Sequence, residues 1–456
     1  MTALVASLLL TATIDGQAAL RHASALSALG PHKWGSPLTK AAADYVEAQF
    51  RDAGLDEVRQ QDFASHGLEG HNVIGVLRAA GPEFVLVGAH HDTAPQAPGA
   101  YDDGGGVGVM IEAARVLAKA GAQPRTLVFV SFDGEEAWST GKTTVAGSRA
   151  YIQKLGSESR HLVAAFVIEM SGYERGTPVL HPIPYADPLR PGRYGVTPAW
   201  LMRAVLAGSL AAGAPLGVGD ARIPWHYQAG VRSFRAGLYG DDLAFVQAGL
   251  PAVFVSDSSF SAFYPWYHEP ADTKDKLSAA ALERMGKSVL GALGALVRVP
   301  VGEASEPHWF AAFGRVFGVF WLWALGVLAI APGLAMAWRA KGPPLALRLL
   351  QAAAMGALLW RHPVPAVFVL ALPTLLSAFA PRIVVALLGL LPGLSLLVLA
   401  GLAYQRDLAR SLWFRPWELA LLVAALALLF VRVSAPGRAG RRRAAAAPKR
   451  RRALGK

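Results

Sequence analysis

The chain has 456 residues, a formal net charge of +12 and 53% hydrophobic residues, and this length allows about two or three domains. It contains no cysteine, which excludes disulfide bonds and thiolate metal ligands. Ten of its 44 lysine and arginine residues lie at Arg432 or beyond, so the net charge does not indicate a basic globular surface, and we expect no nucleic-acid partner.

Residues 1–10 form a short apolar run that no basic residue precedes. A secretory signal peptide normally begins with a positively charged region, so this run is a poor signal peptide. It fits a truncated anchor or a misplaced start codon equally well. We assign residues 1–22 to a short apolar N-terminus of this kind.

Residues 23–300 are predicted to form one domain in which strands and helices alternate. Apolar, β-branched runs of strand length are Asn72–Leu77, Phe84–Ala89, Leu127–Phe132, Ala164–Met170 and Ala252–Ser256. Helical periodicity is found in Leu38–Ala53, Val107–Ala120, Pro198–Ala212 and Ala279–Val299. Buried strands that alternate with helices predict an α/β fold, here a three-layer αβα sandwich with a mostly parallel central sheet.

Carboxylate and imidazole side chains gather at the predicted strand ends. In sheets of this kind, active sites form outside the carboxyl ends of the strands. Carboxylate oxygens with neutral imidazoles suit a catalytic zinc centre better than a closed structural one. The residues at or just past the strand ends are His90, Glu135, Glu136 and Glu169.

Each of these short segments is a weak indication alone, and their joint occurrence favours a centre with two zinc ions. Two ions that share a water molecule need one bridging carboxylate and further ligands on each side. The candidates are Asp102 as the bridge, His90 and Glu169 on one ion, and Glu136 and His268 on the other.

Neighbours of these candidates suggest how the centre works. Glu135 is adjacent to a ligand but free itself, so it can act as the general base. Asp92 follows His90 by two residues and can orient the imidazole by accepting its second N–H. We expect His91 to point to the opposite face, because successive side chains along a strand alternate. The run Gly104-Gly105-Gly106 fits close backbone packing at the metal site better than a phosphate-binding loop.

The order and spacing of five segments resemble the co-catalytic zinc aminopeptidases typified by secreted bacterial leucyl aminopeptidases. The family includes glutamate carboxypeptidases and has glutaminyl cyclases as relatives, and the resemblance covers residues from about 23 to 299. The matching segments are Val87–Thr93, Pro98–Val107, Phe132–Glu136, Gly240–Phe245 and Tyr267–Thr273.

The resemblance implies the ligand and base roles given above, and it adds three further expectations. The Asp102–Asp103 peptide bond should be cis. Asp241 lies in a segment similar to the Ser/Thr-Asp block of the family and should support the ligands. Tyr267 should hydrogen-bond the tetrahedral intermediate.

Glu169 departs from the pattern, because most aminopeptidases of this family carry aspartate there. The sequence around Glu169 looks more like the membrane-embedded branch typified by the endoplasmic-reticulum metallopeptidase and its yeast vacuolar relatives. Those proteins attach a C-terminal membrane region with several spans to the peptidase domain. The resemblance to this branch therefore implies a membrane protein.

The C-terminal third fits that expectation. Residues 301–315 are predicted as a linker, 316–433 as an α-helical transmembrane region and 434–456 as a basic cytoplasmic tail. The second and third apolar spans are shorter than the ~20 residues of a perpendicular helix and fit a re-entrant pair as well. The five spans are Val316–Met336, Leu345–Trp360, Val364–Ala380, Ile383–Ala403 and Trp417–Val433.

We therefore predict a membrane-anchored, zinc-dependent exopeptidase with two zinc ions per chain, most simply an aminopeptidase. Its partners would be a peptide substrate and the lipid bilayer, with the peptidase domain on the non-cytoplasmic (periplasmic or extracellular) side. One alternative is carboxypeptidase or glutaminyl-cyclase-like activity on the same scaffold, and the related cyclases use a single zinc ion. Another alternative is a catalytically silent receptor or transporter subunit.

Overall fold

The computed structural model describes residues 14–136, 145–181, 184–186, 194–218, 225–228, 240–257, 264–300, 309–312 and 315–318. The chain divides into two units, residues 1–318 and residues 319–456, and every described residue lies in the first. The predicted spans between residues 316 and 433 thus lie outside the described residues, except for residues 316–318. Within the described ranges, no helix has both the length and the apolar character needed to cross a bilayer.

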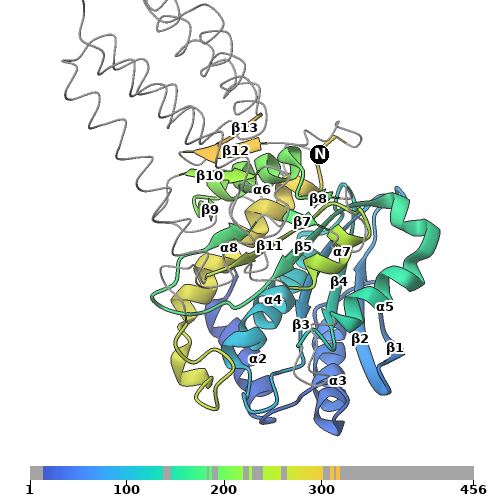
Figure 1. Ribbon diagram of the computed structural model, residues 1–456, viewed down its shortest axis with the longest axis vertical. Coiled ribbons are helices and arrows are strands. Elements are labelled where there is room, and N and C mark those ends of the chain that lie inside the picture. Colours follow the sequence, from blue (N-terminus) through green and yellow to red (C-terminus); the bar gives the residue numbers. More distant parts are fainter. Residues whose placement is uncertain are drawn as a thin grey trace, which may run out of the picture. The chain divides into compact units, whose positions relative to one another are not determined.

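An eight-stranded sheet lies at the centre of the described unit, with strand order β1-β2-β4-β3-β5-β11-β6-β9 (Figure 1). Strands β4, β3, β5 and β11 are parallel, and β3 and β5 are buried along their whole length. The bounds are β1 Glu57–Ser65, β2 Leu68–Leu77, β3 Phe84–His90, β4 Thr126–Phe132, β5 Leu162–Ile168, β6 Val179–His181, β9 Gly217–Val218 and β11 Ala252–Ser256.

The sheet is mixed, so the expectation of a mostly parallel sheet is correct only for its centre. Strand β2 is antiparallel to both β1 and β4, and β6 is antiparallel to β11. Strands β1 and β2 are joined by two residues, His66 and Gly67, whose φ angles are 53° and 79°. Two consecutive positive φ angles are typical of the tight turn of a hairpin, which forces an antiparallel pair.

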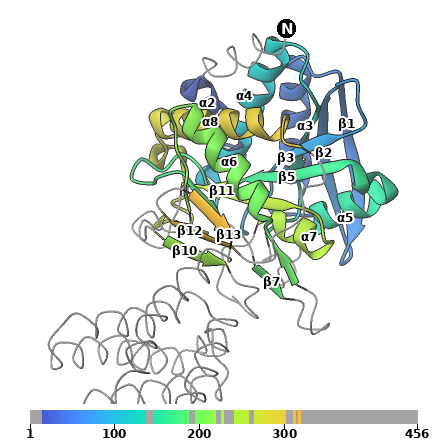
Figure 2. The same cartoon turned by 90° about the horizontal axis from the view of Figure 1, so that it is seen from above.

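Helices cover both faces of the sheet (Figure 2). One face and its large apolar core are covered by α2 Gly16–Ser27, α3 Pro37–Asp52, α4 Gly105–Ala120, α6 Ala199–Ala211 and α8 Ala279–Leu296. The opposite face is covered by α5 Ala146–Leu155 and α7 Asp242–Gln247. The predicted α/β fold is thus confirmed, and every strand and helix predicted between residues 23 and 300 is present with its ends shifted by at most four residues.

The N-terminal boundary predicted at residue 22 falls inside helix α2. Asp15 caps this helix by accepting hydrogen bonds from the N–H groups of Gln17 and Ala18, at 2.9 and 3.2 Å. Ile14 is 2% exposed and packs near Gly286 of α8. Residues 14–22 therefore belong to the packed domain, because their apolar side chains fill its core. Residues 1–13 lie outside the described part of the chain.

Short strands complete the described unit. Strands β7 Pro184–Ala186 and β8 Tyr194–Val196 pair, and β10 Trp225–Gln228 pairs with β12 Trp309–Ala312, which pairs with β13 Arg315–Gly318. Strand β12 lies within the predicted linker, and β13 overlaps the start of the first predicted span. The difference comes from backbone pairing, because β12 is hydrogen-bonded to β10 and β13 is hydrogen-bonded to β12.

Candidate metal centre

The carboxyl edge of the parallel strands brings the predicted ligands together. His90 is the last residue of β3, Glu169 follows β5 directly, and Glu136 lies four residues past the end of β4. Asp102 lies in the kinked segment Ala100–Gly104 just before α4, and His268 lies in the loop before α8. Segments far apart in the sequence meet here because parallel strands end at the same edge of the sheet.

Asp102 lies between two histidines. Its Oδ1 is 3.3 Å from Nε2 of His90, and its Oδ2 is 3.2 Å from Nε2 of His268. His90 Nε2 is also 3.5 Å from Oε2 of Glu169, and His268 Nε2 is 3.2 Å from Oε2 of Glu136. The five side chains thus form two groups that share one carboxylate, which is the arrangement that a bridged pair of ions requires.

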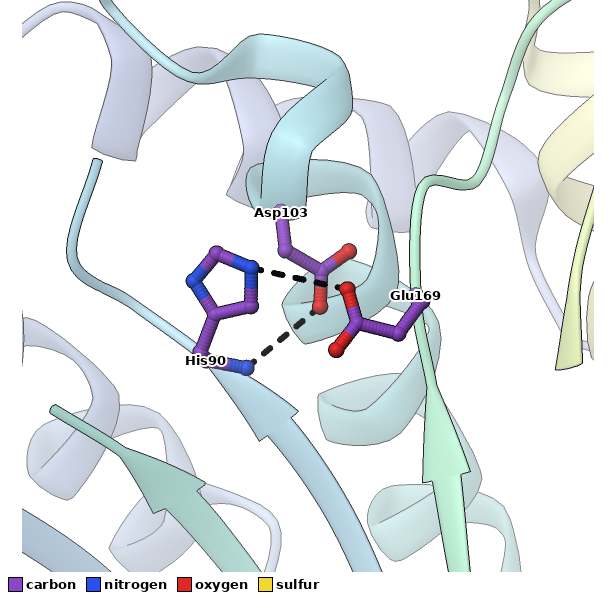
Figure 3. Close-up of side chains that lie close together, drawn as sticks. All are labelled: His90, Asp103 and Glu169. Carbon is purple, nitrogen blue, oxygen red and sulfur yellow. Dashed lines mark hydrogen bonds and ion pairs between the residues drawn. The ribbon is translucent and has the colours of Figure 1, made fainter. Parts of the chain in front are cut away.

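The group around His90 contains a second aspartate. Figure 3 shows His90, Asp103 and Glu169 converging where β3 and β5 end. The Asp103 carboxylate accepts hydrogen bonds from two backbone N–H groups, those of Gly106 at 3.0 Å and His90 at 3.4 Å. The Asp102 carboxylate instead faces the imidazole nitrogens of His90 and His268, so of the two aspartates it is the better placed for a cation shared between the two groups. The Asp102–Asp103 peptide bond is cis, as the resemblance implied.

Asp92 acts differently from the sequence-based expectation. The nearest acceptor to Nδ1 of His90 is the main-chain carbonyl of Asp92, at 3.0 Å, whereas its carboxylate Oδ1 lies 3.5 Å away. The carboxylate accepts the backbone N–H groups of Glu135 and Glu136, each at 3.1 Å. Asp92 therefore orients the imidazole through its carbonyl and holds the Glu135–Glu136 turn through its carboxylate.

His91 points away from this centre, as alternation along the strand predicts. Its Nδ1 is 3.0 Å from Oγ of Ser131, and burial lowers the pKa of His91 to about 3. The glycine run after Asp102 packs against the segment that follows Glu169. A Cβ at Gly105 would lie 1.9 Å from the carbonyl oxygen of Ser171, so only glycine permits this close approach of α4 to the end of β5.

Two buried aspartates that received no predicted role hold the segment around Asp102. The Asp272 carboxylate accepts the backbone N–H of Tyr101 at 2.9 Å, that of Asp102 at 3.3 Å and the hydroxyl of Tyr264 at 2.9 Å. The Asp257 carboxylate accepts the hydroxyl of Tyr101 at 2.6 Å. The sequence held a sign of both roles. Asp272 lies in the segment that follows His268, and Asp257 directly follows strand β11, so both could have been placed near the carboxyl edge of the sheet.

The two softer predictions lie near the ligands. Asp241 is fully buried; burial raises its pKa to about 8, while His90 and the Ser148 hydroxyl lower it. The Tyr267 ring stacks on the His268 ring with centroids 3.7 Å apart. The Gln96 side chain donates a hydrogen bond to the carbonyl of His268 at 3.2 Å, which holds the loop that carries this histidine.

The buried carboxylates of the centre favour the protonated form of its two histidines. Burial lowers the pKa of His90, but Glu169 and Asp102 outweigh it and raise this pKa well above its usual value. Burial also lowers the pKa of His268, and Asp102 and Glu136 raise it to about 10. Burial, with Asp102, raises the pKa of Glu136 to about 7. A divalent cation would replace these protons, because a metal binds the deprotonated ligands.

The donor set fits zinc. Oε1 of Glu136 and Oε1 of Glu169 are buried and have no hydrogen-bond partner among the residues that the structure describes. Within the same residues, no lysine or arginine forms an ion pair with a carboxylate of the centre. Buried carboxylates of this kind need a cation, and imidazole with carboxylate is a typical ligand set for catalytic zinc.

Comparisons with known proteins identify relatives of this chain. Residues 72–293 match the family model of peptidase family M28. Leucine aminopeptidase 1 of Metarhizium robertsii is 26% identical over 257 residues, which are 54% of this chain and 60% of that protein. Aminopeptidase YwaD of Bacillus subtilis is 27% identical over 229 residues, which are 49% of this chain and 44% of that protein.

A solved structure shares the fold. The crystal structure of LapB from Legionella pneumophila superposes with a TM-score of 0.51 and 20% identity, over 65% of this chain and 75% of that chain. The chain spans 60% of the length of the Metarhizium relative and 44% of the Bacillus relative.

Proposed function

Residues 72–293 belong to peptidase family M28, and from this premise we propose that the chain is a zinc-dependent aminopeptidase that uses two zinc ions. The observation that carries the proposal is the position of Asp102, whose two carboxylate oxygens lie 3.3 and 3.2 Å from the Nε2 atoms of His90 and His268. The names of the Metarhizium and Bacillus relatives support the choice of an aminopeptidase.

The proposed ligands are His90, Asp102 and Glu169 for one ion and Asp102, Glu136 and His268 for the other. When bound, the metal would polarise the peptide carbonyl and lower the pKa of the attacking water. The Asp92 carbonyl would keep a proton on Nδ1 of His90, which leaves Nε2 free to bind.

Glu135 is the proposed general base. It would take the proton from the attacking water and give it to the leaving amine. Burial raises the pKa of Glu135 well above its usual value, with His90 opposing the shift. A raised pKa suits this role, because a base works best when its pKa lies near the working pH. The hydrogen bond from the Glu135 N–H to Asp92 positions this residue next to the ligand Glu136.

Metal counting on the purified full-length chain tests the proposal. We expect two zinc ions in the wild type and one in His90→Ala and in His268→Ala. Asp102→Ala should retain neither, because this side chain is shared. His161→Ala is a matched control, since this histidine pairs with Glu158 at 4.0 Å and should not affect zinc. A single ion in the wild type would favour the glutaminyl-cyclase-like alternative, and none would contradict the proposal.

We also propose that residues 316–433 anchor the enzyme in a membrane, with the peptidase domain on the non-cytoplasmic side. The apolar segments and the arginine-rich residues 434–456 support this orientation. Alkaline carbonate should leave the chain in the membrane fraction, and protease added outside the cells or spheroplasts should digest the peptidase domain but spare a C-terminal tag. Release by carbonate, or digestion of the tag, would contradict the proposal.

A further inference from the structure

Gly240, which lies two residues before helix α7, lies against the side chain of Glu169. A Cβ built on Gly240 would lie 2.3 Å from Oε1, 2.9 Å from Cδ and 3.1 Å from Cγ of Glu169. Contacts under 3.0 Å require one of the two groups to move. No side chain larger than hydrogen fits at residue 240 while Glu169 keeps its present position.

The backbone at Gly240 does not itself require glycine. Its φ angle lies outside the left-handed region, unlike those of Gly134 and Gly172. Its N–H donates to Oδ1 of Asp242 at 3.3 Å, and its carbonyl accepts the N–H of Leu243 at 3.0 Å. Any L-residue can adopt this arrangement, so the steric conflict with Glu169 is the reason for glycine that the structure provides.

Glu169 needs the space because its carboxylate lies between Gly240 and His90. The residue is 4% exposed, and Oε2 lies 3.5 Å from Nε2 of His90. Oε1 faces Gly240 and has no hydrogen-bond partner among the described residues. A glutamate is one methylene longer than an aspartate, so its carboxylate extends further from the strand end. The space left by the missing side chain at residue 240 accommodates the extra methylene of Glu169.

We propose that Gly240 is a positioning residue of the metal centre and forms a size-matched pair with Glu169. The missing side chain at residue 240 leaves the space in which the longer carboxylate reaches its metal-binding position. This inference rests on the proposed function, because it takes Glu169 as a zinc ligand.

A side chain at residue 240 should weaken zinc binding and leave the stability of the fold unchanged. The clashing atoms belong to one flexible side chain, so the protein relieves the clash by moving the Glu169 carboxylate. Gly208 of α6 is the opposite case, since a Cβ there would lie 2.2 Å from the carbonyl oxygen of Gly291 in α8. Relief of that clash requires two helices to separate, which lowers stability and leaves the ligands in place.

The test compares Gly240→Ala, Glu169→Asp and the double variant in the purified full-length chain. Zinc per chain, zinc affinity by competition with a chromophoric chelator, and the visible spectrum of the cobalt-substituted chain are measured. Gly240→Ala should weaken one zinc site about 10–100-fold, the usual effect of changing a group that supports a ligand. In the Glu169→Asp background the same change should weaken zinc binding less than it does beside Glu169, because the closest clash, the one with Oε1 of Glu169, is absent there.

Two glycine-to-alanine variants are the controls. Gly81 has open space around its Cβ position, so Gly81→Ala should behave as the wild type in every measurement. Gly208→Ala should lower the melting temperature of the metal-free chain and leave zinc affinity unchanged.

Wild-type zinc affinity in Gly240→Ala, or an equal loss in both backgrounds, would overturn the inference. If Gly240→Ala fails to fold, a folded double variant supports the pair and an unfolded one overturns it. A wild-type chain that binds no zinc would instead contradict the proposed function, so the two failures are distinguishable.

Discussion

Replacing Asp92 by asparagine tests how the Glu135–Glu136 turn is held. The pKa of Asp92 is lowered: burial raises it, but His90 and the other neighbours outweigh burial, so this carboxylate is ionised at neutral pH. It accepts two backbone N–H groups at 3.1 Å. Asparagine keeps one acceptor oxygen, but its own NH2 group faces the second backbone N–H. One of the two hydrogen bonds is therefore lost.

The expected loss of activity corresponds to the free energy of one hydrogen bond to a charged acceptor. Such a bond contributes about 1.5–3 kcal/mol, and each ~1.4 kcal/mol changes a rate about tenfold. If the loss falls on the transition state, kcat/KM of Asp92→Asn for a leucyl peptide should decrease about 10- to 150-fold. Hydrolysis rates and zinc content are measured together, so that loss of metal is separated from misplacement of Glu135.

Asp133 provides the matched control. It is fully buried and accepts the backbone N–H of His71 at 3.0 Å. Burial, with Asp92, raises the pKa of Asp133 well above its usual value. Asparagine at this position keeps an oxygen that can accept the His71 N–H. Asp133→Asn should retain wild-type hydrolysis. Equal losses in the two variants, or no loss in Asp92→Asn, would refute the role given to the Asp92 carboxylate.

Two further predictions concern the base and the ligands. Glu135→Ala should keep both zinc ions and lose at least about 100-fold in turnover, since general-base catalysis contributes that much or more; wild-type turnover in this variant would remove Glu135 from its role. Zinc binding at pH 8 should release protons, because His268 has its pKa raised to about 10 and must lose a proton to bind. Affinity should therefore rise with pH, more steeply below pH 7, where Glu136 with its pKa of about 7 is protonated too. Calorimetry in buffers of different ionisation enthalpy measures the release, and binding without proton release would contradict the ligand assignment.

The buried central strands could be predicted from the sequence, whereas the edge of the sheet could not. Strands β3 and β5 lie in a buried parallel sheet, so continuous apolar runs mark them. Strand β1 has the sequence EVRQQDFAS and no buried residue. Its backbone pairing with β2 stabilises it, and side-chain hydropathy does not report that pairing. Strand β1 was missed for this reason, and with it the hairpin that makes β2 antiparallel to its neighbours.

The metal centre, too, could be predicted from the sequence only in part. His90 and Glu169 are recognisable from their positions at strand ends, because parallel topology places such ends together. Contacts between distant segments set the direction in which each side chain points. The spacing of residues along the sequence does not reveal these contacts. Thus the Asp92 carboxylate accepts backbone N–H groups from the turn after β4, and Asp272 holds the segment of Asp102. The match between Gly240 and Glu169 joins residues that are 71 positions apart, and only the structure brings them together.

Hydrolysis of a leucyl peptide with a free or an acetylated amino end tests the central claim most directly. The purified full-length chain is assayed zinc-loaded, metal-stripped and after zinc is restored. Cleavage of the free peptide alone, abolished by stripping and regained with zinc, is the predicted result. Cleavage of both peptides would contradict the aminopeptidase assignment in favour of a carboxypeptidase or endopeptidase, and cleavage that persists without metal would contradict the zinc centre itself.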